Sequence, residues 1–259
     1  MERQKGKVLM RALSITLFVL ALELVAAAHA RQISQADSSM STAKDLMLLG
    51  HLANEAHEKG EIKEEIEYRR NYSQMGWAAN PTSRAGSVNR WLIVYTNDMP
   101  LAILLEGTHE WAEAEAVYRH NQTALEGEVV AGDDVKSANE LHLAHLLARE
   151  GKQKEAREIC TYWEKRVKRI GRASDDSPEA EVGAWDLACG RTEEGMRLLK
   201  QQMGAHPRML APYTVVSEYS IADGDFEKGR RTETDGVWAV LGEGPAMEKQ
   251  VVDSERELH

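Results

Sequence analysis

Two histidines three positions apart form the first pattern in this chain that could do chemistry. His142 and His145 lie in a segment rich in Ala, Leu and Glu. On a helix this spacing places both imidazoles on one face, where they could bind a metal ion if carboxylates from another helix joined them. Core or solvent-exposed histidines explain the same spacing without a metal. We therefore assign no metal and no cofactor here.

Alternating acidic residues near the C-terminal end form a second candidate site. Asp223, Asp225 and Glu227 surround Gly224 and resemble a fragment of a calcium-binding loop. A Gly-Asp turn between two helices accounts for the same residues, because both residue types favour tight turns. We interpret this segment as a turn.

Two carboxylates, Glu110 and Glu113, are the candidates for hydrolytic chemistry on a helical array. The chain contains no GxSxG motif, no Walker loop, no HExxH motif and no cysteine beside an activating histidine. We therefore expect no enzymatic activity. A carboxylate enzyme remains the alternative, and loss of an assayable activity in Glu110→Gln would support it.

The two cysteines, Cys160 and Cys189, are expected on neighbouring helices. In an oxidising compartment they could form a disulfide. Two small, separately buried thiols are the other interpretation, because two cysteines in a long chain do not make a disulfide framework. Neither has a second cysteine at metal-ligand spacing.

The N-terminus has the three parts of a signal peptide. Lys5, Lys7 and Arg11 are basic, residues 12–28 are predominantly apolar with Glu23 as their one charged residue, and Ala28-His29-Ala30 has the small-x-small cleavage pattern. We therefore expect a signal peptide over residues 1–30 and an exported protein, periplasmic or secreted. An uncleaved helix that tethers the chain to a membrane is the alternative, and membrane contact is expected only in that case.

Composition predicts an all-α protein with one good core. Of 259 residues, 42% are apolar and 29% charged, and the chain has only two Phe and six Pro. Ala, Leu, Glu, Lys and Arg fill long helical windows, while alternating β-branched runs are missing. The net charge of −10 argues against a dedicated nucleic-acid binder, which needs a basic face. It favours a basic or neutral partner.

Five turns must position these residues. They divide residues 43–241 into five helix pairs. We expect a mobile segment at 31–42 before these pairs, with the first helix beginning at Thr42 or Ala43, and a charged tail at 242–259 after them. The expected turn residues are Gly60, His109, Gly151, Gly190 and Gly224. A helix pair that cannot bury its own apolar face must stack on its neighbours. In the second pair, Pro100 either kinks one helix or begins another with Asn97 or Asp98 as its N-cap.

The chain resembles the tetratricopeptide repeat family from about residue 43 to 241. Gly190 and Gly224 are 34 positions apart, which is the period of that family. The matching elements in the last three pairs are Leu143-Ala144, Gly151, Glu155-Ala156, Trp163, Val182-Gly183, Gly190, Gly195, Pro207, Val216-Ser217, Gly224 and Gly229. The resemblance implies a right-handed solenoid of about five helical hairpins.

The resemblance also implies a concave groove lined by the first helix of each pair, where peptides or proteins dock. At matching offsets this groove would present Asn54, His57, Glu58, Ile103, His145, Arg149, Ala184 and Glu218. Members that clamp a peptide carboxylate carry lysines and asparagines at set positions. Only Asn54 fits here, so a carboxylate ligand is not expected.

These features together predict an exported, non-enzymatic scaffold that binds a protein or peptide partner in its groove. His145 and Arg149 are the expected main contacts. A tethered factor that assembles or regulates an envelope complex is the first alternative, and the carboxylate enzyme is the second.

Overall fold

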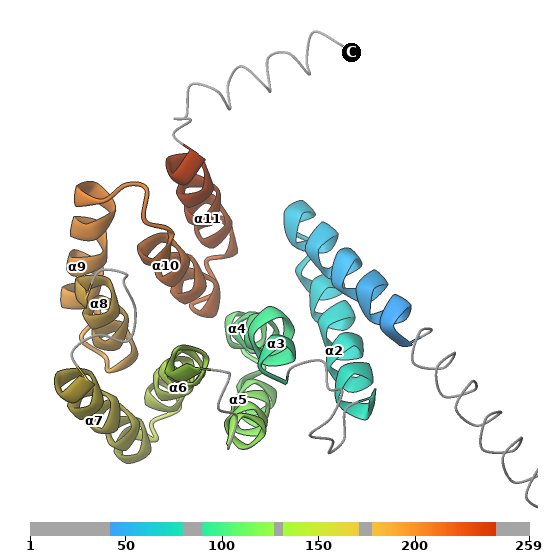
Figure 1. Ribbon diagram of the computed structural model, residues 1–259, viewed down its shortest axis with the longest axis horizontal. Coiled ribbons are helices and arrows are strands. Elements are labelled where there is room, and N and C mark those ends of the chain that lie inside the picture. Colours follow the sequence, from blue (N-terminus) through green and yellow to red (C-terminus); the bar gives the residue numbers. More distant parts are fainter. Residues whose placement is uncertain (1–41, 80–89, 127–131, 171–177, 242–259) are drawn as a thin grey trace, which may run out of the picture. The chain divides into compact units, whose positions relative to one another are not determined.

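A computed structural model describes residues 42–79, 90–126, 132–170 and 178–241 of the chain (Figure 1). The chain forms two compact units, Met1–Leu49 and Gly50–His259. In the first unit, the described residues 42–49 are helical. The expected signal peptide at 1–30, nearly all of the segment at 31–42 and the tail at 242–259 lie outside the described residues. Helices α2 to α11 all belong to the second unit.

The described part of the second unit consists of helices and turns and contains no strand, which confirms the all-α prediction. Helical residues 50–59 come first. The following helices are α2 (Ile62–Ala79), α3 (Arg90–Ile93), the π-helical turn η1 (Val94–Asp98), α4 (Met99–Gly107), α5 (Trp111–Leu125), α6 (Gly132–Arg149), α7 (Gln153–Ile170), α8 (Pro178–Ala188), α9 (Thr192–Ala205), α10 (Leu210–Ala222) and α11 (Phe226–Leu241).

All five expected turn residues adopt left-handed backbone conformations. Their φ angles are 72° at Gly60, 66° at His109, 81° at Gly151, 79° at Gly190 and 86° at Gly224. In each turn the next N–H donates to a carbonyl five residues earlier, at 2.7 to 2.9 Å. This bond closes the helix end in a Schellman motif and satisfies a carbonyl that the helix itself leaves free. The predicted turn positions are therefore confirmed.

His109 is the one turn residue that has a side chain. A non-glycine residue in the left-handed region destabilises the folded chain by about 1–2 kcal/mol. Glycine removes this strain, but it also increases the entropy of the unfolded chain, which offsets part of the gain. We expect His109→Gly to raise the free energy of unfolding by about 0.5–1 kcal/mol, measured by urea unfolding. The matched control is Gly151→Ala, whose added Cβ would meet nothing within 4 Å. It should lower stability by about 1 kcal/mol, and equal effects of the two changes would contradict this account.

Pro100 does not begin a separate helix. Helix α3 passes through η1 directly into α4, so the chain keeps one helical path with a π turn just before the proline. Asp98 has helical backbone angles and its side chain makes no cap, so the N-cap interpretation of Asn97 or Asp98 is wrong. Both side chains are buried, and Asp98 accepts hydrogen bonds from Trp77 Nε1 at 2.8 Å and Asn97 Nδ2 at 3.0 Å. Burial raises the pKa of Asp98 despite these donors.

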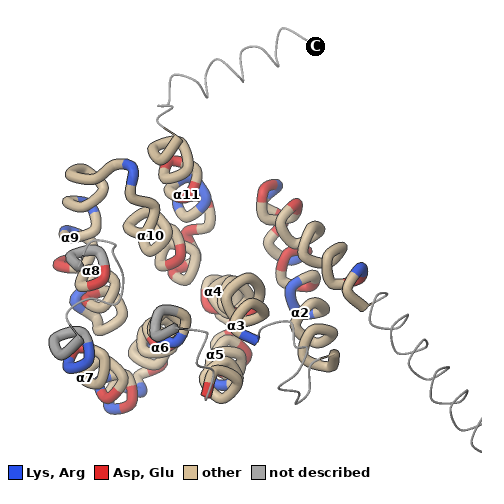
Figure 2. The backbone as a smooth tube through the Cα atoms, in the orientation of Figure 1, with Lys and Arg blue, Asp and Glu red and all other residues tan. Residues whose placement is uncertain are grey.

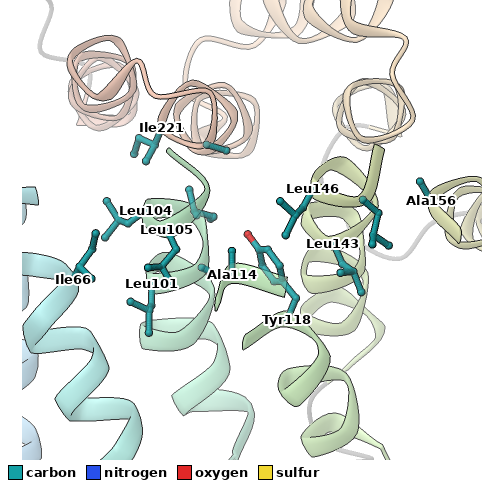
Figure 3. Close-up of a cluster of buried hydrophobic side chains, with 14 residues drawn as sticks. Ile66, Leu101, Leu104, Leu105, Ala114, Tyr118, Leu143, Leu146, Ala156 and Ile221 are labelled. Atoms are coloured by element: carbon teal, nitrogen blue, oxygen red, sulfur yellow. The ribbon is translucent and has the colours of Figure 1, made fainter. Parts of the chain in front are cut away.

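Helices α4 and α10 pack against each other although they are far apart in the sequence. Their contact contributes to a buried apolar cluster that also takes in α2, α5 and α6 (Figure 3). At the end of α4, Gly107 lies against the carbonyl oxygen of Ile221 and the ring of Phe226, where an added Cβ would collide. Glycine is required here because two backbones meet.

Each of these two central helices carries a single charged residue. Glu106 is the only one in α4 and Glu218 the only one in α10. Both helices accordingly appear almost uniformly tan in Figure 2, whereas α7, α9 and α11 carry many charges. A carboxylate on an otherwise apolar, packed helix needs specific partners, because burial of an unpaired charge is costly. The partners of Glu106 and Glu218 define the candidate site.

Candidate functional site

Glu106 is the centre of a buried ion cluster. Its side chain is fully inaccessible to solvent. Oε1 accepts a hydrogen bond from the hydroxyl of Tyr118 in α5 at 2.8 Å, and Oε2 lies 3.3 Å from Nδ1 of His145 in α6. The guanidinium of Arg149, one helical turn beyond His145, is 3.9 Å from the same oxygen. Three helices thus meet at one carboxylate.

His142 connects this cluster to Glu218. Its Nε2 lies 3.1 Å from Glu218 Oε2, and its ring stacks between Tyr118 and Tyr219 at centroid distances of 6.1 and 5.1 Å. Burial disfavours the imidazolium, but the hydrogen bond to Glu218 and the charges of Glu218 and Glu106 raise the pKa of His142 above its usual value. His142 and His145 are therefore partners of carboxylates on α10 and α4.

Arg149 caps the end of α10. It donates to the carbonyl oxygen of Ala222 at 2.7 Å, pairs with Asp223 at 3.3 Å and lies over the ring of Trp111 at 5.6 Å. A cation at a helix C-terminus satisfies free carbonyls and complements the helix dipole. Arg149 thus joins the end of α10 to α6, and its guanidinium is already paired with Ala222 and Asp223.

A cavity of about 200 Å³ lies beside this cluster. We call it the α4–α10 cavity. Its lining comes from helical residues 50–59, α2, α4, α10 and α11, and consists of Asn54, His57, Glu65, Arg69, Pro100, Ile103, Leu104, Thr214, Ser217, Glu218, Ile221 and Glu233. Part of this lining is apolar and the rest is polar or charged. Asn54, His57, Ile103 and Glu218, which the sequence places in a binding groove, line this one cavity.

His57 bridges two carboxylates of the cavity. Its Nε2 lies 3.2 Å from Glu233 in α11 and its Nδ1 3.1 Å from Glu65 in α2. These hydrogen bonds, Glu233 first, raise the pKa of His57 to about 9. Glu65 also accepts from Arg69 Nε at 2.8 Å. At neutral pH, His57 is therefore a cation that joins the first helix pair to the last helix.

The raised pKa of His57 predicts a loss of stability at alkaline pH. Since its folded pKa of about 9 lies above the unfolded value near 6.5, its contribution is complete below about pH 6.5 and disappears as the pH rises through 9. We expect the free energy of unfolding to fall by about 1–3 kcal/mol over this interval. Urea unfolding from pH 6 to 9.5 measures it. The decrease should be absent in His57→Gln. In the control His206→Gln, which replaces an exposed histidine, it should be as large as in the parent.

The structure separates the predicted groove residues into three groups. Asn54, His57 and Glu218 line the α4–α10 cavity, while His145 and Arg149 belong to the ion cluster, with 13% and 23% of their side chains exposed. Glu58 is exposed and lies outside both.

Two further residues expected in the groove are buried. Ile103 is 3% exposed but lines the α4–α10 cavity, whereas Ala184 is 5% exposed and lies in a separate buried cluster, so the expectation that Ala184 is presented to a partner is wrong. Packing of α10 on α4 covers Ile103 except where it meets the cavity.

The carboxylates considered for hydrolysis are held in an ion pair. Arg70 contacts Glu110 at 2.6 Å and Glu113 at 2.7 Å. Both glutamates therefore form ion pairs with the same cation. Among the described residues, no group of three His, Cys, Asp or Glu side chains is arranged to hold a metal ion.

Cys160 and Cys189 form a disulfide, with their Cα atoms 6.1 Å apart. The two cysteines are therefore paired in a disulfide and are not separate buried thiols. It joins α7 to the end of α8, adjoining a second core that contains Trp163, Trp185 and Leu199.

Sequence reasoning missed Glu106, Glu65 and Glu233. Glu106 has a recognisable signal, because it is the single charge at the end of the apolar run Leu101–Leu105. Glu65 and Glu233 have none, since each lies in a helix with many charges. Glu65 contacts His57 and Arg69, which are near it in the sequence, whereas the contact of Glu233 with His57 joins positions 176 residues apart.

Within the described helices, none is both long and apolar enough to cross a bilayer. Comparisons of the chain with protein-family models, with curated proteins and with solved structures give no match.

Proposed function

We propose that this protein is an exported, non-enzymatic protein that binds a peptide or protein partner. In this proposal its helices form a right-handed solenoid of helical hairpins similar to tetratricopeptide repeats. Five Schellman turns at the expected positions support the repeat interpretation. The disulfide supports export, because disulfides persist mainly in oxidising compartments.

One observation carries the proposal of binding. Four residues that the repeat resemblance places in the groove, Asn54, His57, Ile103 and Glu218, line a single cavity with both apolar and polar lining. Binding sites typically combine apolar walls with a few placed polar groups. At about 200 Å³ the cavity has room for one side chain of a partner, whose remaining residues would lie over the exposed rim around Asn54 and Glu58.

Site-specific photocrosslinking tests this proposal. A benzoylphenylalanine in place of exposed Asn54, at the cavity, is compared with the same group in place of exposed Thr192, at the start of α9. We expect one partner to be captured from Asn54 in the host envelope and not from Thr192, with the bound segment mapped by mass spectrometry. Identical products from both positions, or none from Asn54, would contradict the proposal.

A further inference from the structure

The cations in the α4–α10 cavity are already paired. Both ring nitrogens of His57 contact carboxylates. Arg69 is 7% exposed, binds Glu65 through Nε and donates to the carbonyl of Thr96 at 3.3 Å. An anionic ligand would have to displace one of these contacts, because neither cation is held free to receive it.

Two of the three carboxylates that line the same cavity, Glu218 and Glu233, contact a side chain of the chain through one oxygen only. Glu218 contacts His142 through Oε2, and Glu233 contacts His57 through Oε2. The other oxygen of each carboxylate has no partner among the described residues. Carboxylate oxygens can accept several hydrogen bonds, so both glutamates can take a further donor.

Ser217 gives an independent indication that a donor belongs here. Its side chain lines the cavity and is only 3% exposed, yet its hydroxyl has no hydrogen-bond partner in the part of the chain that the structure describes. Its neighbours on α10 behave differently, since Ser220 bonds to the carbonyl of Val216 at 2.7 Å and Thr214 to that of Leu210 at 3.4 Å. A hydroxyl that lines the cavity and bonds to no described neighbour can accept a hydrogen bond from a ligand.

The cavity also has apolar lining. It consists of Pro100, Ile103 and Leu104 from α4 and Ile221 from α10, and Figure 3 shows Leu104 and Ile221 from these two helices. A basic side chain matches this combination, because its stem packs on apolar surface while its head donates to acceptors. The net charge of −10 also attracts cationic partners.

From this arrangement we infer that the α4–α10 cavity binds one arginine or lysine side chain of the partner, with its head between Glu218, Glu233 and the Ser217 hydroxyl. This inference rests on the proposed function and deepens it by giving the chemistry of the ligand. A site that binds a peptide carboxylate would instead need free cations.

Two blocked peptides that differ in one group test it. Ac-Gly-Ala-Arg-Ala-Gly-NH2 is titrated into the full chain beside its citrulline analogue, which keeps the shape of arginine without its charge, with binding followed by NMR. We expect the arginine peptide to bind at least tenfold more tightly. Ser217→Ala and Glu218→Gln should each weaken it severalfold or more, whereas Glu193→Gln, an exposed change on α9, should have no effect.

Several results would overturn the inference. They are equal binding of the arginine and citrulline peptides, no binding of the arginine peptide at millimolar concentration, or insensitivity to Ser217→Ala. Because Glu218→Gln also removes the partner of His142, Ser217→Ala is the variant that separates ligand contact from folding, and thermal melting checks both. If Asn54 crosslinks to a partner segment that lacks arginine and lysine, the inference fails and the proposed function remains. If nothing crosslinks, the proposed function fails as well.

Discussion

Replacement of Glu106 by alanine is expected to lower the free energy of unfolding by about 3–5 kcal/mol, because it leaves the partners of a buried ion pair uncompensated. The hydroxyl of fully buried Tyr118 would lose its acceptor, and His145 and Arg149 would lose the carboxylate that they share. Urea unfolding measures the change. The matched control is Glu193→Ala on exposed surface, which should stay within about 0.5 kcal/mol of the parent.

A double-mutant cycle then separates the hydrogen bond from the loss of volume. Tyr118→Phe removes the donor alone, and its effect should be much smaller in the Glu106→Ala background than in the parent. We expect a coupling energy of about 0.5–3 kcal/mol between the two positions. Simple additivity would show that the two side chains do not act together, and a loss below 1 kcal/mol for Glu106→Ala would contradict the cluster's role in stability.

Reduction of the Cys160–Cys189 disulfide is expected to lower stability by about 2–4 kcal/mol. The bond closes a loop with a sequence separation of 29, and without it the unfolded chain regains the entropy of that loop. Urea unfolding with and without a reducing agent measures the difference.

The double variant Cys160→Ser, Cys189→Ser provides the control for this measurement. It should match the reduced parent and should not respond to the reducing agent. A parent protein whose unfolding is the same in both conditions would show that the disulfide contributes nothing, and a variant that still responds would show that the agent acts elsewhere.

Sequence reasoning located the turns because their cause is local. A helix end that needs a left-handed residue favours glycine at that position, and even His109 was recognisable from its place between two helical segments. The sequence leaves the disulfide undecided, because whether two thiols meet depends on how α7 lies beside α8.

The contacts of the candidate site could be predicted only in part. The helical offsets that place His145, Arg149 and Glu218 on one side of their helices are periodic and visible in the sequence. What those side chains bind is decided by the packing of α10 on α4, which no local pattern encodes. Packing also explains why Ala184, expected in the groove, lies in a separate buried cluster.

The contact between Gly107 and Ile221 has a consequence for the order in which the chain folds. It joins positions roughly 110 residues apart, whereas each Schellman turn closes within a few residues, and distant contacts carry the larger loop-closure cost. The helix pairs should therefore form early and the α4–α10 contact late. If the disulfide forms before this contact, it shortens the loop between α4 and α10. A ligand in the α4–α10 cavity would accordingly recognise the completed chain and none of its separate helix pairs.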